Sequence, residues 1–184
     1  MPQVLVPLAQ GCEELEAVTI IDLLRRAEIQ VTTAGLGSGP VKASRGTVLL
    51  PDTELDQVMD QVFDMIVLPG GLPGATHLDD DPRIHRLLAR QAEQGGYNAA
   101  ICAAPKVLAH AGLLDGRRAT SYPGTLRGDD FPSLQLVDAP VVVDGKLVTS
   151  RGPGTAMDFA LELIELLVGR ERRVDVESKL MRPA

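Results

Sequence analysis

The chain contains few of the residues that bind metals or build disulfide frameworks. Its 184 residues include two cysteines and three histidines, and His77, His85 and His110 are scattered along the sequence. Two cysteines are expected to be free thiols, and neither they nor the histidines have the ligand spacing of a zinc or iron site. No histidine is placed convincingly beside a cysteine for hydrolysis. The sequence therefore predicts neither a metal nor another cofactor.

Positive charge and long apolar runs are also scarce. The chain has 25 acidic residues against 18 lysines and arginines, a net charge of -7, which argues against a stable complex with nucleic acid. No apolar run approaches the ~20 residues that a membrane span needs. The N-terminus leads directly into Val4-Leu5-Val6 without a basic leader. These features predict a cytoplasmic protein with no membrane partner.

Short apolar runs alternate with helical patterns along the chain. Ala17, Ile20 and Leu24 have the spacing of one buried helix face, and a similar pattern recurs over 157–168. The alternation predicts one α/β domain over residues 1–184, with a mostly parallel sheet and helices on both sides. The expected strands are 4–8, 29–35, 65–68, 99–102 and 146–150.

Weaker patterns fill the remainder. Segments 41–50 and 134–143 predict hairpins at the margins, and 121–132 is the longest irregular stretch, which suits a loop at a site. The last long helix has a second apolar face, and we expect a second subunit to cover it. This face consists of Leu163, Leu166 and Leu167.

Cys102 is the strongest candidate for chemistry. It ends a buried strand, and Pro105 suits the first turn of a following helix, so the thiol lies at a strand-to-helix elbow. Such a position favours a thiolate and predicts a depressed thiol pKa. The alternative is a small buried hydrophobic residue, which is what most free cysteines are. The apolar strand before Cys102 and the helix-start signal at Pro105 favour the functional interpretation.

Three loops at the same sheet edge, 10–16, 69–74 and 149–154, are where partners for this thiol are expected. Gly70 and Gly71 follow a strand, and their N–H groups together with that of Ala103 suit an oxyanion hole, although Gly-Gly is also a simple tight turn. The acidic helix start at 13–16 suits a solvated helix end for Glu13 and Glu14, whereas periodicity does not decide the environment of Glu16. A carboxyl beside the thiol would share a proton with it.

Cys12 follows the first strand, so it also lies at this edge. A resolving or disulfide role and an inert thiol are both compatible with its position, and the inert thiol is favoured.

Three motifs follow strands in the sequence. They are Leu68-Pro69-Gly70-Gly71, Ala100-Ile101-Cys102-Ala103-Ala104-Pro105 and Thr149-Ser150-Arg151-Gly152-Pro153-Gly154-Thr155. In this order they resemble the ThiJ/PfpI superfamily, in the branch of the parkinsonism-associated protein deglycase and bacterial YajL. The resemblance extends from Val4 to about residue 171, and it implies a flavodoxin-like sandwich, a homodimer and a reactive cysteine.

The resemblance also implies roles for single residues. Cys102 would be the nucleophile, with a protonated Glu16 as its hydrogen-bonding partner. Gly71 and Ala103 would supply the N–H groups. The other implied site residues are Arg26 and Arg45, near the site and the dimer contact, and Pro153, from the partner subunit.

Two positions depart from the superfamily pattern. Ala103 stands where protease-like members have a histidine, so a peptidase or amidotransferase triad is not supported. Tyr122 lies where human-type members carry a histidine, and a phenol is a poor base near neutrality.

The resemblance implies a cofactor-independent glyoxalase or deglycase, acting on methylglyoxal, glyoxal or their adducts. The alternative is a redox-sensing stress protein or chaperone in which Cys102 is oxidised to a sulfinate, because an exposed low-pKa thiol is both nucleophilic and sensitive to peroxide. A third possibility is a structural dimer with no activity, which requires an ordinary thiol pKa.

Overall fold

A seven-stranded sheet forms the centre of the computed structural model, which describes residues 1–182. The strand order is β10-β11-β7-β6-β1-β2-β5, and all neighbours are parallel except β10 and β11. The five predicted strands form the contiguous middle of this sheet. The strands are β1 (Gln3–Leu8), β2 (Gln30–Gly35), β5 (Thr53–Glu54), β6 (Met65–Leu68), β7 (Tyr97–Ile101), β10 (Val141–Asp144) and β11 (Leu147–Ser150).

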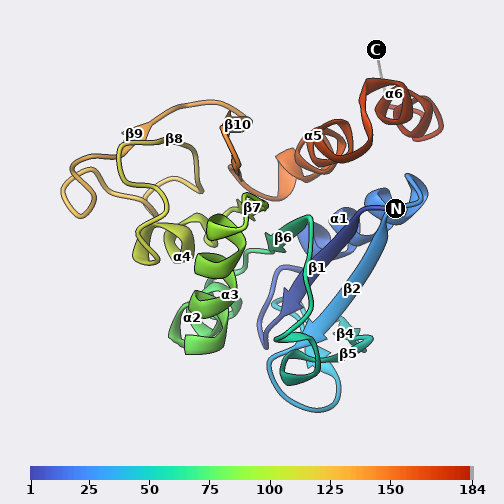
Figure 1. Ribbon diagram of the computed structural model, residues 1–184, viewed down its shortest axis with the longest axis horizontal. Coiled ribbons are helices and arrows are strands. Elements are labelled where there is room, and N and C mark those ends of the chain that lie inside the picture. The colour runs from blue at the N-terminus through green and yellow to red at the C-terminus, as the bar shows by residue number, and fades with distance from the viewer. Residues whose placement is uncertain (183–184) are drawn as a thin grey trace.

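Helices cover both faces of the sheet, which confirms the flavodoxin-like sandwich. Helices α1, α5 and α6 lie on one side, and α2, α3 and α4 lie on the other (Figure 1). The helices are α1 (Glu14–Arg26), α2 (Leu72–Asp80), α3 (Pro82–Glu93), α4 (Pro105–His110), α5 (Ala156–Val168) and α6 (Arg170–Ser178), with single helical turns at Leu55–Val58 and Pro153–Thr155. Over residues 1–182, no helix combines the length and apolar character needed to cross a membrane.

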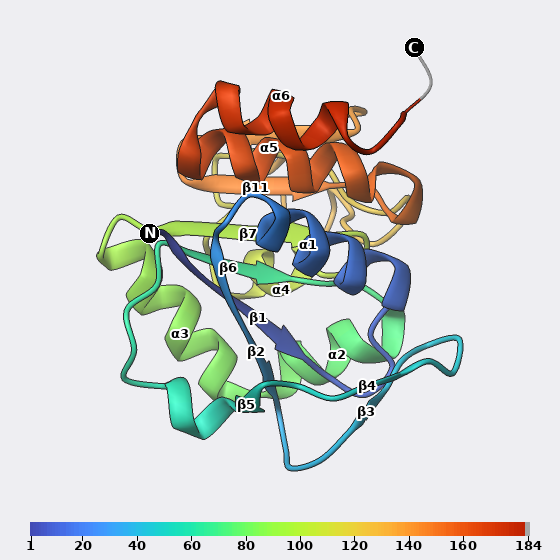
Figure 2. The same cartoon turned by 90° about the vertical axis from the view of Figure 1, so that its right-hand side faces the viewer.

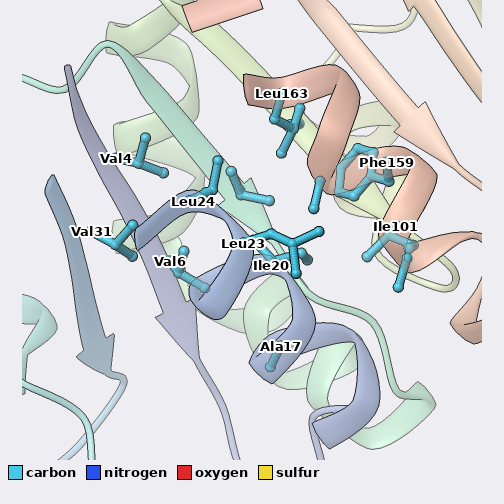
Figure 3. Close-up of a cluster of buried hydrophobic side chains, with 14 of the residues drawn as sticks. Val4, Val6, Ala17, Ile20, Leu23, Leu24, Val31, Ile101, Phe159 and Leu163 are labelled. Atoms are coloured by element: carbon cyan, nitrogen blue, oxygen red, sulfur yellow. The ribbon is translucent and has the colours of Figure 1, made fainter. Parts of the chain in front are cut away.

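Alternation along each strand divides the core into two layers. In β1, Val4 and Val6 point to the layer under α1 and α5, while Leu5 points to the layer under α2, α3 and α4. Helices α1 and α5 pack side by side along the same face (Figure 2). Figure 3 shows the cluster between them and the sheet, where Phe159 of α5 is fully buried.

One of the two marginal segments differs from the sequence-based prediction. Segment 41–50 is the expected hairpin, with β3 (Val41–Lys42) antiparallel to β4 (Val48–Leu49). Segment 134–143 is not a hairpin. Its first part, β9 (Gln135–Leu136), pairs in parallel with β8 (Arg118–Ala119), and its second part becomes β10 of the main sheet. Apolar alternation predicted extended chain here but did not identify the partner strand.

The second apolar face of α5 is covered within the same chain. Helix α6 folds back along α5, and its Val176 is buried in the cluster that contains Leu163. Leu166 and Leu167 are partly buried against this cluster. Burial on both faces of α5 is therefore confirmed, with α6, which begins immediately after Gly169, covering part of the second face, and the contribution of a second subunit stays a prediction.

Replacement of Phe159 by alanine tests the central core layer. Phe159→Ala removes a buried ring, and we expect a loss of about 3–5 kcal/mol in the free energy of unfolding. Denaturant unfolding measures this change. Val62→Ala is the matched control, since Val62 is 65% exposed and its truncation should alter stability by less than about 0.5 kcal/mol. Equal effects of the two substitutions would contradict the assigned packing.

Candidate active site

Cys102 lies at the turn between β7 and α4, as the sequence predicted. Its φ of 64° is in the left-handed region, which non-glycine residues rarely adopt. Two hydrogen bonds hold this backbone. The Cys102 N–H donates to the Ser150 carbonyl at 2.9 Å, and the Cys102 carbonyl accepts from the Tyr122 N–H at 2.8 Å. Local strain at a residue held from both sides is characteristic of active sites.

Glu16 is the buried carboxyl of the acidic helix start. It lies in the first turn of α1 and has no exposed surface. Its Oε2 accepts a hydrogen bond from the Gly70 N–H at 2.8 Å, and its side chain interacts with the Cys102 thiol. Oε1 is buried and has no hydrogen-bond partner among residues 1–182. The structure thus brings Glu16 and Cys102 together, from positions 86 residues apart in the chain.

The Gly70-Gly71 turn fills the space between these two groups. The Gly70 carbonyl accepts from the Glu13 N–H at 2.9 Å, so this one residue is bonded to the start of α1 through both its N–H and its carbonyl. A Cβ at Gly70 would lie 2.6 Å from both the Cys102 Cβ and the Glu16 Oε2. Gly71 has a φ of 88°, and its N–H, like that of Ala103, is directed at the Cys102 sulfur. Glycine is required here by close approach.

Burial and mutual repulsion decide the protonation of the pair. Burial raises the pKa of Glu16 to about 7, against the opposing effects of the Gly70 N–H and the thiol. Burial, and then the charge of an ionised Glu16, raises the pKa of the Cys102 thiol to about 12. The N–H groups of Gly71 and Ala103 lower this pKa but do not outweigh the two larger effects. The predicted depression of the Cys102 thiol pKa is therefore wrong.

The location of one proton controls whether a thiolate forms. Two adjacent buried anions are strongly disfavoured, so the pair retains a proton at neutral pH. A proton on Oε1 of Glu16 would convert an unpaired acceptor into a donor and would remove the charge that opposes the thiolate. A reactive thiolate at Cys102 thus requires a protonated Glu16.

Glu13 and Glu14 are not a solvated helix end. The Glu14 carboxylate accepts from the N–H of Arg45 at 3.0 Å and of Thr47 at 3.3 Å, and the Ser44 hydroxyl donates to Glu13 at 2.8 Å. Although desolvation acts against it, hydrogen bonding lowers the pKa of Glu14 to about 2. The start of α1 therefore anchors the turn between β3 and β4. The interaction joins segments 30 residues apart, so helical periodicity could not have predicted it.

A cavity of about 570 Å³ opens over the thiol. Tyr122, on the irregular segment 121–132, is half exposed here, and Arg45 enters from the hairpin turn. Lys106 also lines the cavity, although the sequence analysis did not select it. The signal was its position four residues after Cys102, in the first turn of the next helix. The lining residues are Glu13, Arg45, Gly71, Leu72, Cys102, Ala103, Lys106, Tyr122, Pro123, Gly124, Thr125 and Pro153.

The single chain also places two other implied site residues. The chain's own Pro153 lines the cavity from the segment after β11, and the contribution expected from Pro153 of the partner subunit stays a prediction. Arg26 is in the last turn of α1, whereas Glu16 is in the first, and it pairs with Asp22 at 2.6 Å. Within one chain Arg26 is not part of this cavity.

Comparison with known proteins agrees with this geometry. Residues 2–166 match the model of the DJ-1/PfpI family. The chain belongs to the DJ-1/PfpI family. It is 48% identical over 179 residues to protein dj-1beta of Drosophila melanogaster, covering 96% of this chain and 95% of the relative. The crystal structure of Drosophila melanogaster DJ-1beta superposes with a TM-score of 0.94 at 46% identity, covering 100% of this chain and 99% of that chain.

A relative in Caenorhabditis elegans carries an enzymatic name. It is called a glutathione-independent glyoxalase, DJR-1.2, and is 37% identical over 163 residues, covering 89% of this chain and 87% of the relative. At the level of the DJ-1/PfpI family, these findings support glyoxalase chemistry.

The histidines of this DJ-1/PfpI member lie outside the cavity. His77 contacts the Gln10 carbonyl at 2.8 Å through Nδ1, and His85 and His110 both approach the Asp79 carboxylate. Among residues 1–182, no cluster of three or more histidine, cysteine or acidic side chains is arranged to hold a metal.

Cys12 is a free, buried thiol. Burial, assisted by the charge of Glu14, raises the pKa of this thiol to about 11. Cys12 is therefore protonated near neutral pH, which fits the inert interpretation and makes a nucleophilic role unfavourable.

The raised pKa of Glu16 predicts a pH-dependent stability. Between about pH 4.5 and 7, folded Glu16 keeps a proton that the unfolded chain releases, so rising pH destabilises the fold. The test compares Cys102→Ala, which removes the thiol, with the double variant Cys102→Ala/Glu16→Gln. From pH 4 to 8, we expect the free energy of unfolding of the first to fall by about 3 kcal/mol relative to that of the second. Denaturant unfolding across this range measures the difference. A difference that does not change with pH would show that Glu16 is solvated.

Gly70 supplies a steric test. Gly70→Ala forces a methyl group against Cys102 and Glu16, and we expect a loss of about 1–3 kcal/mol in unfolding free energy together with slower alkylation of the thiol. The control is Gly37→Ala, because a Cβ at Gly37 meets nothing within 4 Å. Wild-type stability and thiol reactivity in Gly70→Ala would refute the close approach described here.

Proposed function

We propose that this protein is a cofactor-independent glyoxalase or deglycase that acts on methylglyoxal, glyoxal or their adducts. The main support is the Cys102 thiol held beside the buried, proton-retaining Glu16, with two backbone N–H groups directed at the sulfur. This arrangement supplies a nucleophile, a proton carrier and hydrogen-bond donors in one cavity. The C. elegans relative named as a glyoxalase adds support at the family level.

The first proposed step is addition to the aldehyde. With the proton on Glu16, the Cys102 thiolate attacks the aldehyde carbon, and a carbon–sulfur bond forms as the carbonyl π electrons move to oxygen. The Gly71 and Ala103 N–H groups stabilise this oxygen, which then takes the proton from Glu16 to give a hemithioacetal and leaves Glu16 ionised. Their positions beside the sulfur suit an oxygen that develops on the neighbouring carbon.

The second step moves a proton between the two substrate carbons. Ionised Glu16 removes the proton from the former aldehyde carbon, and the hydroxyl proton on that carbon's oxygen passes to the neighbouring ketone oxygen, which gives an enediolate. Glu16 then returns its proton to the adjacent carbon, and a thioester forms. Water then cleaves the carbon–sulfur bond, and a hydroxy acid such as lactate leaves the free thiol. Oxidation of one carbon balances reduction of its neighbour, so no cofactor is required. A carboxyl pKa of about 7 suits a group that must both give and accept a proton.

A homodimer in the cytoplasm is the proposed setting. Leu15 and Val18 are exposed on α1 one turn apart, and Val48 and Leu50 are exposed at the end of the adjacent hairpin. Exposed apolar residues concentrated in this way favour a contact with a second copy. A reactive free thiol is best preserved in a reducing compartment, which supports the cytoplasmic location.

The alternative proposal is a redox-sensing stress protein or chaperone whose Cys102 is oxidised to a sulfinate. The same N–H groups and the protonated Glu16 would hold the sulfinate oxygens, so the pocket alone favours neither function strongly. Measurement of catalytic turnover distinguishes the enzyme proposal from the redox-sensing alternative.

Lactate formation from methylglyoxal is the decisive measurement. Product is followed rather than aldehyde loss, because thiols scavenge aldehydes without catalysis. We expect Cys102→Ser and Glu16→Ala each to lower turnover by at least about 100-fold, since each removes a reacting group. Cys12→Ala is the matched control and should retain activity, because the other thiol lies outside the cavity.

A wild-type rate no higher than that of the Cys102→Ser variant would refute the enzyme proposal. Selective oxidation of Cys102 with protection of client proteins would then support the redox alternative. Lactate formation that persists in Glu16→Ala would remove the proton carrier from the mechanism. Circular dichroism of each variant establishes that it is folded.

A further inference from the structure

Two cations line the cavity from different parts of the fold. Arg45 comes from the turn between β3 and β4, and Lys106 comes from the first turn of α4. Among residues 1–182, neither side chain forms an ion pair or a hydrogen bond. The proposed reaction uses neither of them, since addition, proton transfer and hydrolysis involve only Cys102, Glu16 and backbone N–H groups.

The Arg45 cation is presented by a fixed backbone. Its N–H is bonded to the Glu14 carboxylate at 3.0 Å, while its side chain remains exposed at the cavity. Lys106 is carried by the segment that also positions the nucleophile. Arg45 and Lys106 therefore line the same cavity as the sulfur but come from segments far apart in the sequence. Both side chains are available to a ligand.

The remaining charges limit what this ligand is. The cavity also contains the Glu13 carboxylate, and the Cys102–Glu16 pair holds one negative charge once it has lost one of its two protons. Two positive groups thus face about two negative ones. A singly charged carboxylate can contact the cations without a large excess of negative charge, whereas a doubly charged phosphate is less well matched.

We infer that the substrates of this site are α-oxoaldehydes that carry a carboxylate, and that Lys106 and Arg45 bind this carboxylate while the aldehyde faces Cys102. The reaction rests on the proposed function, but the anion recognition does not. A cavity of about 570 Å³ is much larger than a three-carbon aldehyde, so it has room for a substrate with an additional charged arm.

The chemistry balances for such a substrate. 4,5-Dioxopentanoate and one water give 2-hydroxyglutarate, because the aldehyde carbon rises to the oxidation level of a carboxyl while the ketone carbon is reduced to an alcohol. The carbon–sulfur bond made in the first step is broken by water in the last, and the distal carboxylate is unchanged. No outside oxidant or reductant takes part.

Alkylation of Cys102 tests the anion site without requiring turnover. Iodoacetate and iodoacetamide differ by one carboxylate, and their rate ratio, normalised to the ratio for N-acetylcysteine, measures the preference for an anion beside the thiol. We expect this normalised ratio to exceed one in the wild type and to fall about three- to tenfold in Lys106→Met and in Arg45→Met. Lys106→Arg should retain it, and Lys106→Glu should lower it further.

Lys179→Met is the control for a general change in net charge, because Lys179 is exposed and pairs with Asp175 far from the cavity lining. It should leave the normalised ratio as in the wild type. A ratio that is the same in Lys106→Met, Arg45→Met and the wild type would overturn the inference.

Steady-state kinetics test the substrate class itself. The ratio of kcat/KM for 4,5-dioxopentanoate over the neutral 2-oxopentanal should fall about three- to tenfold in Lys106→Met, mainly through KM. If the wild type converts both substrates and this ratio does not change, glyoxalase function stands and the inference fails. If it converts neither but the alkylation ratio falls, anion recognition stands and the proposed function fails.

Discussion

A buried carboxyl and a thiol that hold one proton between them impose the central constraint on this fold. Glu16 has no exposed surface, and an ionised carboxylate without water is tolerated only where hydrogen bonds or a retained proton compensate for its lost solvation. The Gly70 N–H provides one hydrogen bond to Oε2, and Oε1 accepts none from residues 1–182. The chemistry of Cys102 therefore depends on the burial of α1 as much as on the elbow that bears the sulfur.

The parallel sheet explains how distant segments reach one point. The chain leaves β1, β6, β7 and β11 at one edge, and the next segments supply Glu16, the Gly70-Gly71 turn, Cys102 and Pro153. Gly70 bonds to Glu16 of α1 through its N–H and to Glu13, just before α1, through its carbonyl, so the second loop cannot shift without disturbing the first. Membership of the DJ-1/PfpI family agrees with this arrangement, since the matched region spans all four segments.

The sequence predicted features that depend on local order. Apolar alternation identified the five central strands, and Pro105 after an apolar run identified the elbow at Cys102. Features that depend on long-range packing were not predictable in the same way. Periodicity separated the faces of α1 without revealing that Glu14 meets the hairpin, and the thiol pKa required knowledge of burial and of its charged neighbour. Resemblance supplied Glu16 and Arg45, whereas Lys106 became evident only from the cavity.

The hydrogen bonds from the hairpin turn to Glu14 leave the side chain at position 45 free to vary. Glu14 bonds to the main-chain N–H groups of Arg45 and Thr47, so the shape of the turn does not depend on which side chain occupies position 45. A residue there can be exchanged without refolding its support. A substitution at position 45 would therefore change the charge at the cavity while the turn and the reacting groups stay in place.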